Sequence, residues 1–288
     1  MNTSNLSIII CGIVRNAEKG LKNNIPIIKK VCSQFKDYRV VIYENDSIDK
    51  TKKILKDWKK DNPERIHVLL NDTDKSKTIP DSSEVRCNPF FSKKRIQKMA
   101  ALRNKYLEYI NEQKWNADYL LVVDLDVAQL YFDGIMTSFS TNIEWDVITA
   151  FGYSSSPKLK RRYHDSYALT EWGDEMNPQT EQKIKKLSEK YGKLKTSSSL
   201  IRVYSAFGGL AIYKFELINN LRYRVVLNDD NRVEVRCEHF SICQQIMERK
   251  DSKIYINPSM ALKYQNTTWK IIYNNIKRNL LSYLNTKG

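Results

Sequence analysis

The sequence has no hydrophobic run long enough to span a membrane. It also has no closely spaced cysteine pair of the kind that binds zinc or forms a redox motif. Its longest apolar runs, residues 6–14 and 119–123, are far shorter than the roughly 20 residues that cross a bilayer. No basic segment precedes the first run, so we expect no signal peptide. The five cysteines are odd in number, widely spaced and without a CxxC pair. We therefore expect a cytoplasmic protein with reduced, mostly buried thiols.

The chain has fewer acidic than basic residues, and this imbalance of charge is its first unusual property. The 48 Lys and Arg residues face 33 Asp and Glu residues, which gives a net charge of +15. Such an excess attracts polyanions, anionic lipid or phosphorylated substrates, although dispersed surface lysines encoded by an AT-rich genome give the same sum. The chain has no RNA-recognition, zinc-finger or P-loop motif, and its tyrosines are scattered outside any basic stripe. We therefore expect no nucleic-acid partner.

What the chain does contain is an alternation of strand and helix patterns. Its 288 residues are 41% hydrophobic and 28% charged, which is typical of globular proteins. The patterns predict strands at residues 6–14, 39–43, 65–70 and 119–123, and helices at residues 17–35, 52–60 and 94–111. Strands that alternate with helices predict an α/β fold with a mostly parallel central sheet and helices on both faces.

The remaining segments are less regular. Residues 71–88 are polar without periodicity and predict a long loop. In the second half we expect strands at residues 145–151 and 253–256, helices at residues 179–191 and 240–250, and an apolar segment at residues 201–213 that a Gly-Gly pair interrupts.

Two carboxylates follow the strand predicted at residues 119–123. Asp124 and Asp126 are separated by one residue, so an extended backbone places both side chains on the same side. Ligands bind at the carboxyl ends of strands in such sheets, and two carboxylates there suit Mg²⁺ or Mn²⁺ held together with waters and phosphates. Because Asp-x-Asp is frequent by chance, the metal site depends on its surroundings.

Those surroundings resemble the GT-A glycosyltransferases. The stretch GIVRNAE (residues 12–18) resembles their first strand and loop, VIYENDSIDKT (residues 41–51) their second strand with its acidic turn, and LVVDLDV (residues 121–127) their metal-binding DxD motif. The resemblance extends over most of the chain and implies a GT-A, Rossmann-like sheet. It also implies a nucleotide-diphosphate sugar donor and a Mn²⁺ or Mg²⁺ cofactor.

A narrower resemblance is to capsule-type α-1,3-mannosyltransferases and their bacterial relatives that build surface polysaccharides. It depends on the order of seven short segments: IYENDSIDKTKKIL, RIQKMAALRNKYLEYI, YLLVVDLDV, YHDSY, SAFGGLAIYK, CEHFSIC and INPSMALKY. That family tends to have Asn-Asp-Val where this chain has Asp124-Leu125-Asp126, so the resemblance implies a hexosyltransferase of the retaining kind and leaves GDP- and UDP-hexose both open as donors. It further implies a glycan or lipid-linked saccharide as the acceptor.

The resemblance divides the expected domain of residues 1–266 into two halves. Residues 1–130 would bind the nucleotide sugar, and residues 131–266 would form an irregular acceptor half. Residues 267–288 predict a basic amphipathic helix. This helix would lie on the anionic inner face of the membrane, or it would pack against its own domain.

Binding of the nucleotide-sugar donor requires carboxylates that hold a metal cation and side chains that accept hydrogen bonds from the nucleoside. Asp126 would be the first direct metal ligand, while Asp124 would reach the metal through water or hold the ribose. Glu44 and Asp46 would accept hydrogen bonds from base and ribose; the alternative is a solvated turn in which Asp46 or Ser47 caps the next helix.

Three arginines are also candidates for the donor site. Arg95 and Arg103 are eight residues apart on one helix, so they share roughly one face and would meet the nucleotide or diphosphate. Arg15 follows the first strand and would do the same. A partly buried salt bridge is the alternative for Arg103 and Arg15.

The acceptor side is predicted from the second half. Phe207, Gly208 and Gly209 would form the wall where donor meets acceptor, because glycine lets the backbone approach a ligand, unless the pair is a plain strand bulge. Glu238 would be a catalytic residue, as a general base, as a stabiliser of the reacting centre or as the residue that orients the acceptor. His239 would be a third metal ligand or a structural hydrogen-bonding residue.

One further cluster combines aromatic rings and a carboxylate, which suit the apolar faces and hydroxyl rims of sugars. Its members, Tyr163, His164, Asp165 and Trp172, are expected to contact the acceptor or to form a charged lid. The sequence therefore predicts a metal-dependent hexosyltransferase of surface polysaccharide synthesis. Its alternatives are a nucleotidyltransferase with the same metal site and a non-catalytic basic protein that binds glycan or nucleic acid.

Overall fold

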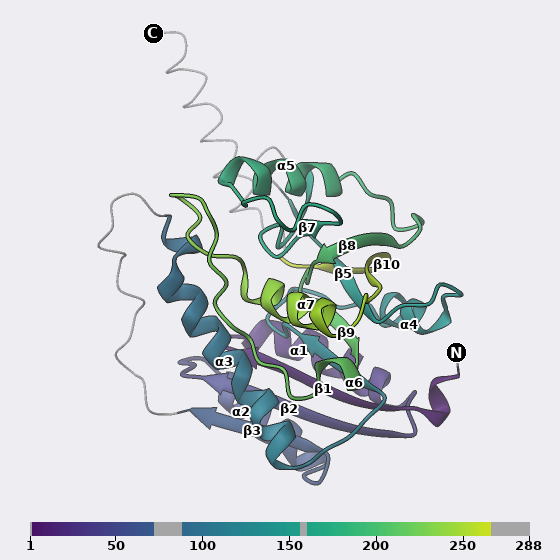
Figure 1. The fold of residues 1–288 in the computed structure, drawn as a ribbon. Coiled ribbons are helices and arrows are strands. Elements are labelled where there is room, and N and C mark those ends of the chain that lie inside the picture. Colours follow the sequence, from purple (N-terminus) through teal and green to yellow (C-terminus); the bar gives the residue numbers. More distant parts are fainter. Residues whose placement is uncertain (1, 72–87, 156–159, 266–288) are drawn as a thin grey trace.

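The computed structural model describes residues 2–71, 88–155 and 160–265, and Figure 1 shows their arrangement. The loop expected at residues 71–88 and the helix expected at residues 267–288 lie almost entirely outside these ranges. In these ranges ten strands form one sheet: β1 (Ser7–Val14), β2 (Asp37–Asn45), β3 (Ile66–Asn71), β4 (Tyr119–Val123), β5 (Val147–Ser155), β6 (Arg161–Tyr163), β7 (Thr170–Glu171), β8 (Ile201–Ser205), β9 (Leu210–Lys214) and β10 (Ile254–Lys263).

Seven α-helices and two short 3₁₀-helices are present in the described residues. The α-helices are α1 (Glu18–Cys32), α2 (Thr51–Asp61), α3 (Lys93–Glu112), α4 (Phe132–Ser140), α5 (Glu181–Tyr191), α6 (Phe215–Ile218) and α7 (Glu238–Arg249). The 3₁₀-helices are η1 (Thr3–Asn5) and η2 (Pro89–Phe91). None of the described helices has both the length and the apolar character needed to cross a membrane.

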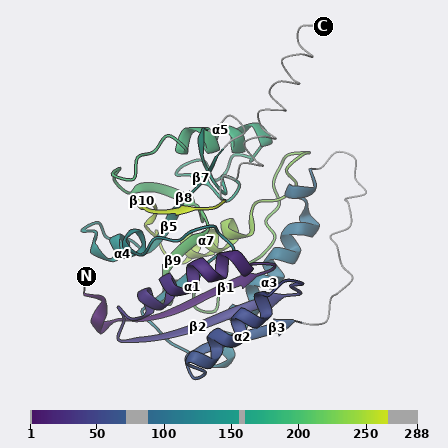
Figure 2. The same cartoon turned by 180° about the vertical axis from the view of Figure 1, so that it is seen from behind.

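The strand order is β3-β2-β1-β4-β9-β5-β10-β8-β7, with β6 paired to β5. Strands β1, β2, β3 and β4 run parallel to one another, so their carboxyl ends meet at one edge of the sheet (Figures 1 and 2). Strand β9 is antiparallel to both of its neighbours, β4 and β5. The predicted α/β class is therefore confirmed, and the parallel strands of the first half supply the edge at which the acidic pair lies.

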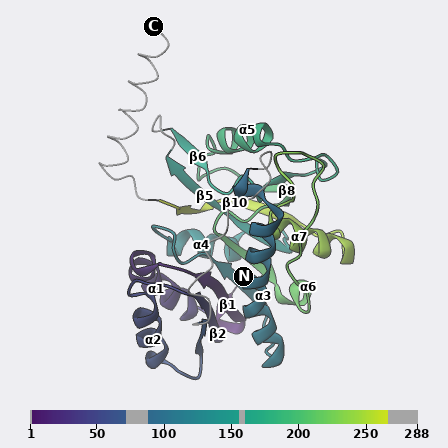
Figure 3. The same cartoon turned by 90° about the vertical axis from the view of Figure 1, so that its left-hand side faces the viewer.

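Alternating side chains build a core on each face of the sheet. In β1, Ile8 and Ile10 belong to the core under α1, α2 and α4, whereas Ile9 and Cys11 belong to the core under α3 and α7. The view in Figure 3 shows α1 and α2 on one side of this strand and α3 on the other. Each fully buried Ile contributes about 1.5–3 kcal/mol, so the two-sided burial fixes the register of the strand.

The apolar segment at residues 201–213 is interrupted at its Gly-Gly pair, as expected. The pair is not a bulge within one strand, because β8 lies beside β10, whereas β9 lies between β4 and β5. Gly208 (φ +65°) and Gly209 (φ +93°) make this change of direction possible, because both are in the left-handed region. Helices α4 and α6 and strands β6 and β7 were not predicted, because such short elements carry too little periodicity. The four cysteines in the described residues are buried and unpaired, as expected.

Candidate functional site

A cavity of about 280 Å³ opens at the carboxyl edge of the parallel strands. Its lining comes from the ends of β1, β2 and β4, from one face of α3 and from the residue that follows β10: Ile13, Val14, Arg15, Asn45, Arg95, Lys98, Met99, Leu102, Arg103, Asp124, Asp126 and Tyr264. Four of these side chains are cationic and two are carboxylates. Such a lining favours a polyanionic ligand together with a metal ion.

The acidic pair lies at the end of β4, as the spacing predicts. Leu125 and Val127 are fully buried, whereas Asp124 and Asp126 alternate with them and line the cavity. The backbone N–H of Asp124 donates a hydrogen bond of 2.9 Å to the carbonyl of Gly209, which fixes the turn from the side of β9. Both carboxylates are therefore held at the same opening by a buried backbone.

Helix α1 packs against the backbone of this turn. A Cβ atom on Gly20 would lie 2.4 Å from the carbonyl oxygen of Leu125, so only glycine allows the helix to approach so closely. The fully buried Asn24 donates to the carbonyls of Leu125 (3.3 Å) and Val127 (2.7 Å) and accepts from the N–H of Leu130 at 2.9 Å. One amide thus satisfies three backbone groups of the acidic turn.

We expect Asn24→Leu to lower the free energy of unfolding by about 3 kcal/mol, because the carbonyl of Val127 and the N–H of Leu130 lose their buried partner. Urea denaturation measures this change. Asn23→Leu is the control, since Asn23 is exposed and donates one hydrogen bond, to the carbonyl of Ala128. Equal stability of the two variants would contradict the role given to Asn24.

The loops after β1 and β2 are joined by side-chain hydrogen bonds. Ser47 accepts from the N–H of Asn16 (2.9 Å), and Thr51 accepts from the N–H of Ala17 (2.8 Å). Glu44 is fully buried and accepts from the N–H of Ser47, and Asp46 adopts φ +52°. The alternative of a solvated turn is therefore wrong, as is the alternative that Asp46 or Ser47 caps α2, whose N-cap is Lys50.

Neither Glu44 nor Asp46 lines the cavity. The side chain of Glu44 points into the buried turn, where Lys52 lies 3.9 Å away. Asn45, between them, takes the place on the cavity lining. The structure thus makes Glu44 a residue that shapes the loop, because its Oε1 accepts from the N–H of Ser47 and its side chain is buried away from the cavity.

The three predicted arginines all line the cavity. Arg103 is buried, and its Nε donates to Glu238 (3.0 Å) while an Nη atom lies 3.3 Å from Asp124. The other Nη atom has no hydrogen-bond partner in the described part of the chain. Arg95 donates to the carbonyl of Phe90 at 3.0 Å, and Arg15 is exposed. Arg103 therefore forms the buried salt bridge given as its alternative, and it also lines the cavity.

The acidic pair has the chemistry of a divalent cation site. Burial raises the pKa of Asp124, and so does the neighbouring charge of Asp126; burial likewise raises the pKa of Asp126. A cation at these oxygens would offset both effects. Within residues 2–71, 88–155 and 160–265, no group of three or more His, Cys, Asp or Glu side chains could hold a metal ion. Asp124 and Asp126 would therefore share a cation with phosphates and waters, as Mg²⁺ sites do.

Glu238 and His239 lie behind this lining. Glu238 is 4% exposed, ion-paired with Arg103 through Oε1, and its Oε2 accepts from the Cys237 thiol at 3.3 Å. His239 is 1% exposed and stacks on Phe207, with ring centroids 3.7 Å apart. Burial lowers the pKa of His239 well below its usual range, so the ring is neutral. Neither residue reaches the cavity, so His239 does not join the acidic pair as a third ligand.

Several predicted acceptor contacts are core residues. Tyr163 and Phe207 are each 1% exposed, and Tyr163 packs against Phe151 and Tyr191. A Cβ on Gly208 would lie 2.3 Å from the carbonyl oxygen of Ala150, so this glycine serves backbone packing against β5. The prediction that these side chains face a sugar was wrong for Tyr163 and Phe207. A buried backbone contact also explains the glycine pair, since Gly209 faces Leu262 and Val127.

His164 and Asp165 lie closer to the cavity. The ring of His164 stacks on Tyr264, which lines the cavity, with centroids 3.3 Å apart. Burial lowers the pKa of His164 to about 4, so the ring is neutral at pH 7. Burial, and after it the charges of Glu238 and Asp124, raises the pKa of the half-buried Asp165 to about 8.

We expect Asp165→Asn to stabilise the protein at pH 8.5 but not at pH 5, without added metal or nucleotide. Between about pH 4 and pH 8 the folded chain keeps a proton on Asp165 that the unfolded chain releases, so the free energy of unfolding falls as the pH rises. Asparagine does not ionise, and it tolerates the left-handed conformation at this position (φ +65°).

Urea denaturation at the two pH values measures the effect. The advantage of Asp165→Asn over the wild type should grow by about 1–3 kcal/mol from pH 5 to pH 8.5. Asp229→Asn, at an exposed position, should show no such growth. A pH-independent difference for Asp165→Asn would contradict the assignment.

Trp172 is not part of this site. It is 48% exposed and lines a separate cavity of about 560 Å³ between β7, β8 and the end of α5. The two cavities share none of the described lining residues. The structure thus brings Arg15, Arg95, Arg103, Asp124 and Asp126 together, places His164 behind Tyr264, and separates Trp172 from them.

Sequence reasoning missed Gly20, Asn24 and Tyr264. Asn24 lies between Leu21, Ile25 and Ile28 on the buried face of α1, and a polar residue on an apolar stripe is a usable signal. Tyr264 carries no such signal, because only the fold brings the end of β10 to the end of β4.

The mostly parallel sheet with helices on both faces is the fold of a GT-A glycosyltransferase. Residues 7–245 match the family model described as cryptococcal mannosyltransferase 1, and the chain belongs to this family. No curated protein sequence matches the chain.

Similar solved structures include glycosyltransferases of low sequence identity. The mannosyltransferase PcManGT from Pyrobaculum calidifontis is 12% identical (TM-score 0.49), over 95% of this chain and 61% of that one. TarS from S. aureus is 14% identical (TM-score 0.49), over 94% and 63%. Glucosyl-3-phosphoglycerate synthase from M. tuberculosis is 10% identical (TM-score 0.45), over 98% and 81%. The chain thus spans about three-fifths of the first two.

Proposed function

We propose that this glycosyltransferase transfers a hexose from a nucleoside-diphosphate sugar to a glycan acceptor in a metal-dependent reaction. One observation carries the proposal: Asp124 and Asp126 lie at the carboxyl edge of a parallel sheet, in one cavity with three arginines and a lysine. The cationic side chains would bind the diphosphate, and the carboxylates would hold a cation against it. The family description makes GDP-mannose the first donor to test.

The chemistry requires stabilisation of the leaving group. As the glycosidic bond breaks, negative charge accumulates on the diphosphate, and a divalent cation on Asp124 and Asp126 would neutralise part of it. Arg15 and Arg95 would hold the same phosphates with their guanidinium groups. Arg95 is held in place before the substrate binds, because it donates to the carbonyl of Phe90 at 3.0 Å.

Glu238 and Arg103 act as one unit in this proposal. Their 3.0 Å ion pair orients Arg103, and Arg103 in turn lies 3.3 Å from Asp124. Glu238 would therefore position Arg103, and through it Asp124, in place of the general-base role that its sequence suggested. His164 and Asp165 would contribute to the acceptor side of the cavity.

We also propose three finer features of this function. These are retention of the anomeric configuration, a role in surface polysaccharide synthesis and a peripheral position on the membrane. The family resemblance implies the first two, and the basic amphipathic pattern of residues 267–288 implies the third.

Calorimetric titration of the full chain with GDP and with UDP, each with Mn²⁺ or with EDTA, tests the proposal. We expect micromolar binding of one nucleotide in Mn²⁺ and its loss in EDTA. Product analysis with the matching nucleotide sugar should then show release of the nucleoside diphosphate. A product that keeps the nucleoside monophosphate would identify a nucleotidyltransferase, and no binding of either nucleotide would refute the proposal.

A further inference from the structure

The cavity beside Trp172 lies at the edge of the sheet opposite to β3, away from the acidic pair. Its lining combines the indole of Trp172 with charged groups of both signs: Glu171 and Asp174 against Lys190 and Arg202. A balanced charge favours a neutral ligand over an anionic one. At about 560 Å³ it lies within the range of small-molecule sites, about 300–1,000 Å³.

The indole ring is held in place although half of it is exposed. The guanidinium carbon of Arg202 lies 4.1 Å from the centroid of the Trp172 ring. Arg202 is itself fixed, because it donates to the carbonyl of Ser252 at 2.8 Å and lies 3.6 Å from Asp251. A Cβ on the next residue, Gly173 (φ +81°), would meet nothing within 4 Å, so the space at Gly173, which also lines the cavity, is open.

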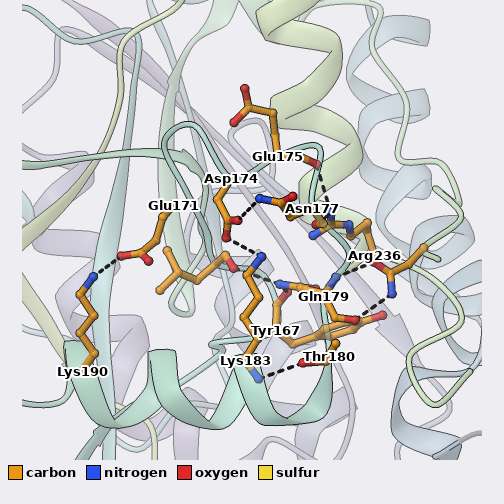
Figure 4. Close-up of polar contacts among 12 residues, drawn as sticks. Tyr167, Glu171, Asp174, Glu175, Asn177, Gln179, Thr180, Lys183, Lys190 and Arg236 are labelled. Carbon is orange, nitrogen blue, oxygen red and sulfur yellow. Dashed lines mark hydrogen bonds and ion pairs between the residues drawn. The ribbon is translucent and has the colours of Figure 1, made fainter. Parts of the chain in front are cut away.

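The loop that carries Trp172 is anchored by a network of polar contacts (Figure 4). Asp174 accepts from the side chain of Asn177 at 2.8 Å and is ion-paired with Lys183. The buried Arg236 donates to the carbonyls of Glu175 (3.1 Å) and Asn177. Because both ends of the loop are tied, the exposed aromatic residue would lose little conformational entropy on binding a ligand.

Hydrogen-bonding groups line the same cavity as the indole ring. Glu171 accepts from Lys190 (2.7 Å) and Tyr191 (2.8 Å) through the same oxygen, Oε1. In the described part of the chain its second oxygen, Oε2, accepts no hydrogen bond. A planar aromatic face beside a half-used carboxylate and an ammonium group matches a pyranose ring, which has an apolar CH face and a rim of hydroxyl groups.

We propose that this cavity is a second saccharide-binding site, which holds an internal unit of a neutral oligosaccharide acceptor on Trp172. The inference rests on the proposed transferase function, because a growing glycan extends beyond the unit that reacts at the acidic pair. It assigns to the acceptor half a site that would favour longer acceptors over short ones.

Calorimetry with manno-, gluco- and galacto-oligosaccharides of two to eight units, without nucleotide or metal, tests this site on the full chain. The wild type should bind at least one series, with affinity that rises with length, and Trp172→Ala should weaken that binding at least about tenfold. Met176→Ala is the matched control, since Met176 is 91% exposed on the same loop but does not line the cavity. It should bind as the wild type does.

Nucleotide binding separates this inference from the proposed function. Trp172→Ala should bind GDP or UDP in Mn²⁺ as the wild type does, and it should raise KM for long acceptors only. Absence of binding for all three series, or equal binding by Trp172→Ala and the wild type, would refute the second site. If nucleotide binding fails while Trp172-dependent oligosaccharide binding is present, the transferase proposal fails and the saccharide site stands.

Discussion

Replacing Asp126 by Ala is expected to lower kcat/KM for sugar transfer by about three orders of magnitude, equivalent to about 4 kcal/mol in the transition state. Asp126 lines the cavity, next to Asp124, and would be the direct ligand of the cation that stabilises the leaving diphosphate. Its removal should therefore affect the reaction far more than the fold. Steady-state kinetics with saturating Mn²⁺ and calorimetry with the nucleoside diphosphate measure both parts of the effect.

The matched control is Asp133→Ala. Asp133 is an exposed carboxylate in the first turn of α4 and does not line the cavity, so its loss should leave kcat/KM unchanged. Metal removal offers a second check, because EDTA should lower the activity of the wild type to the level of Asp126→Ala and should change that variant little. Activity of Asp126→Ala within about threefold of the wild type would exclude the assigned role.

The second large effect is expected for Arg103→Met. Arg103 is 3% exposed and is the cation between Asp124 and Glu238, so its removal leaves two carboxylates without their partner. Breaking a buried pair in this way costs about 3–5 kcal/mol of unfolding free energy. The loss should be smaller at pH 5 than at pH 8, because the pKa of Asp124, which Arg103 lowers, would rise further and the carboxyl group would neutralise.

Urea denaturation at both pH values measures this loss. Arg222→Met is the control: Arg222 is half-exposed and pairs with Glu108 at 2.6 Å on the surface, where such pairs contribute at most about 1 kcal/mol. Glu238→Gln should restore part of the stability of Arg103→Met, since it removes one of the unpaired charges. If the double variant is no more stable than Arg103→Met, the pairing energy lies elsewhere.

The part of the site that sequence predicted depends on short-range spacing. Asp124 and Asp126 follow one strand, and Arg95 and Arg103 lie on one helix, so the local periodicity alone places each pair together. Asn24 could not be assigned in the same way, because its partner Val127 is 103 residues away in the chain. Only the packing of α1 beneath β4 brings them together.

Residue type alone misled the prediction of sugar contacts. Tyr163, Phe207 and Trp172 are all aromatic, but the first two are 1% exposed and the third is 48% exposed. The difference comes from what surrounds each ring: Tyr163 packs on Phe151 and Phe207 on His239, whereas Trp172 lines an open cavity. The fold itself was predicted more fully, because alternating strands and helices leave few topologies open.

The antiparallel strand β9 has a consequence for how the enzyme is synthesised. It completes β4 with residues 210–214, and the carbonyl of Gly209 fixes Asp124. A nascent chain of about half length would therefore present β4 as an unpaired, apolar sheet edge, which is prone to aggregation. The edge that carries Asp124 can be completed only after residue 214 has left the ribosome, so a fragment comprising residues 1–130 should not bind nucleotide. Such non-local pairing also predicts slow folding.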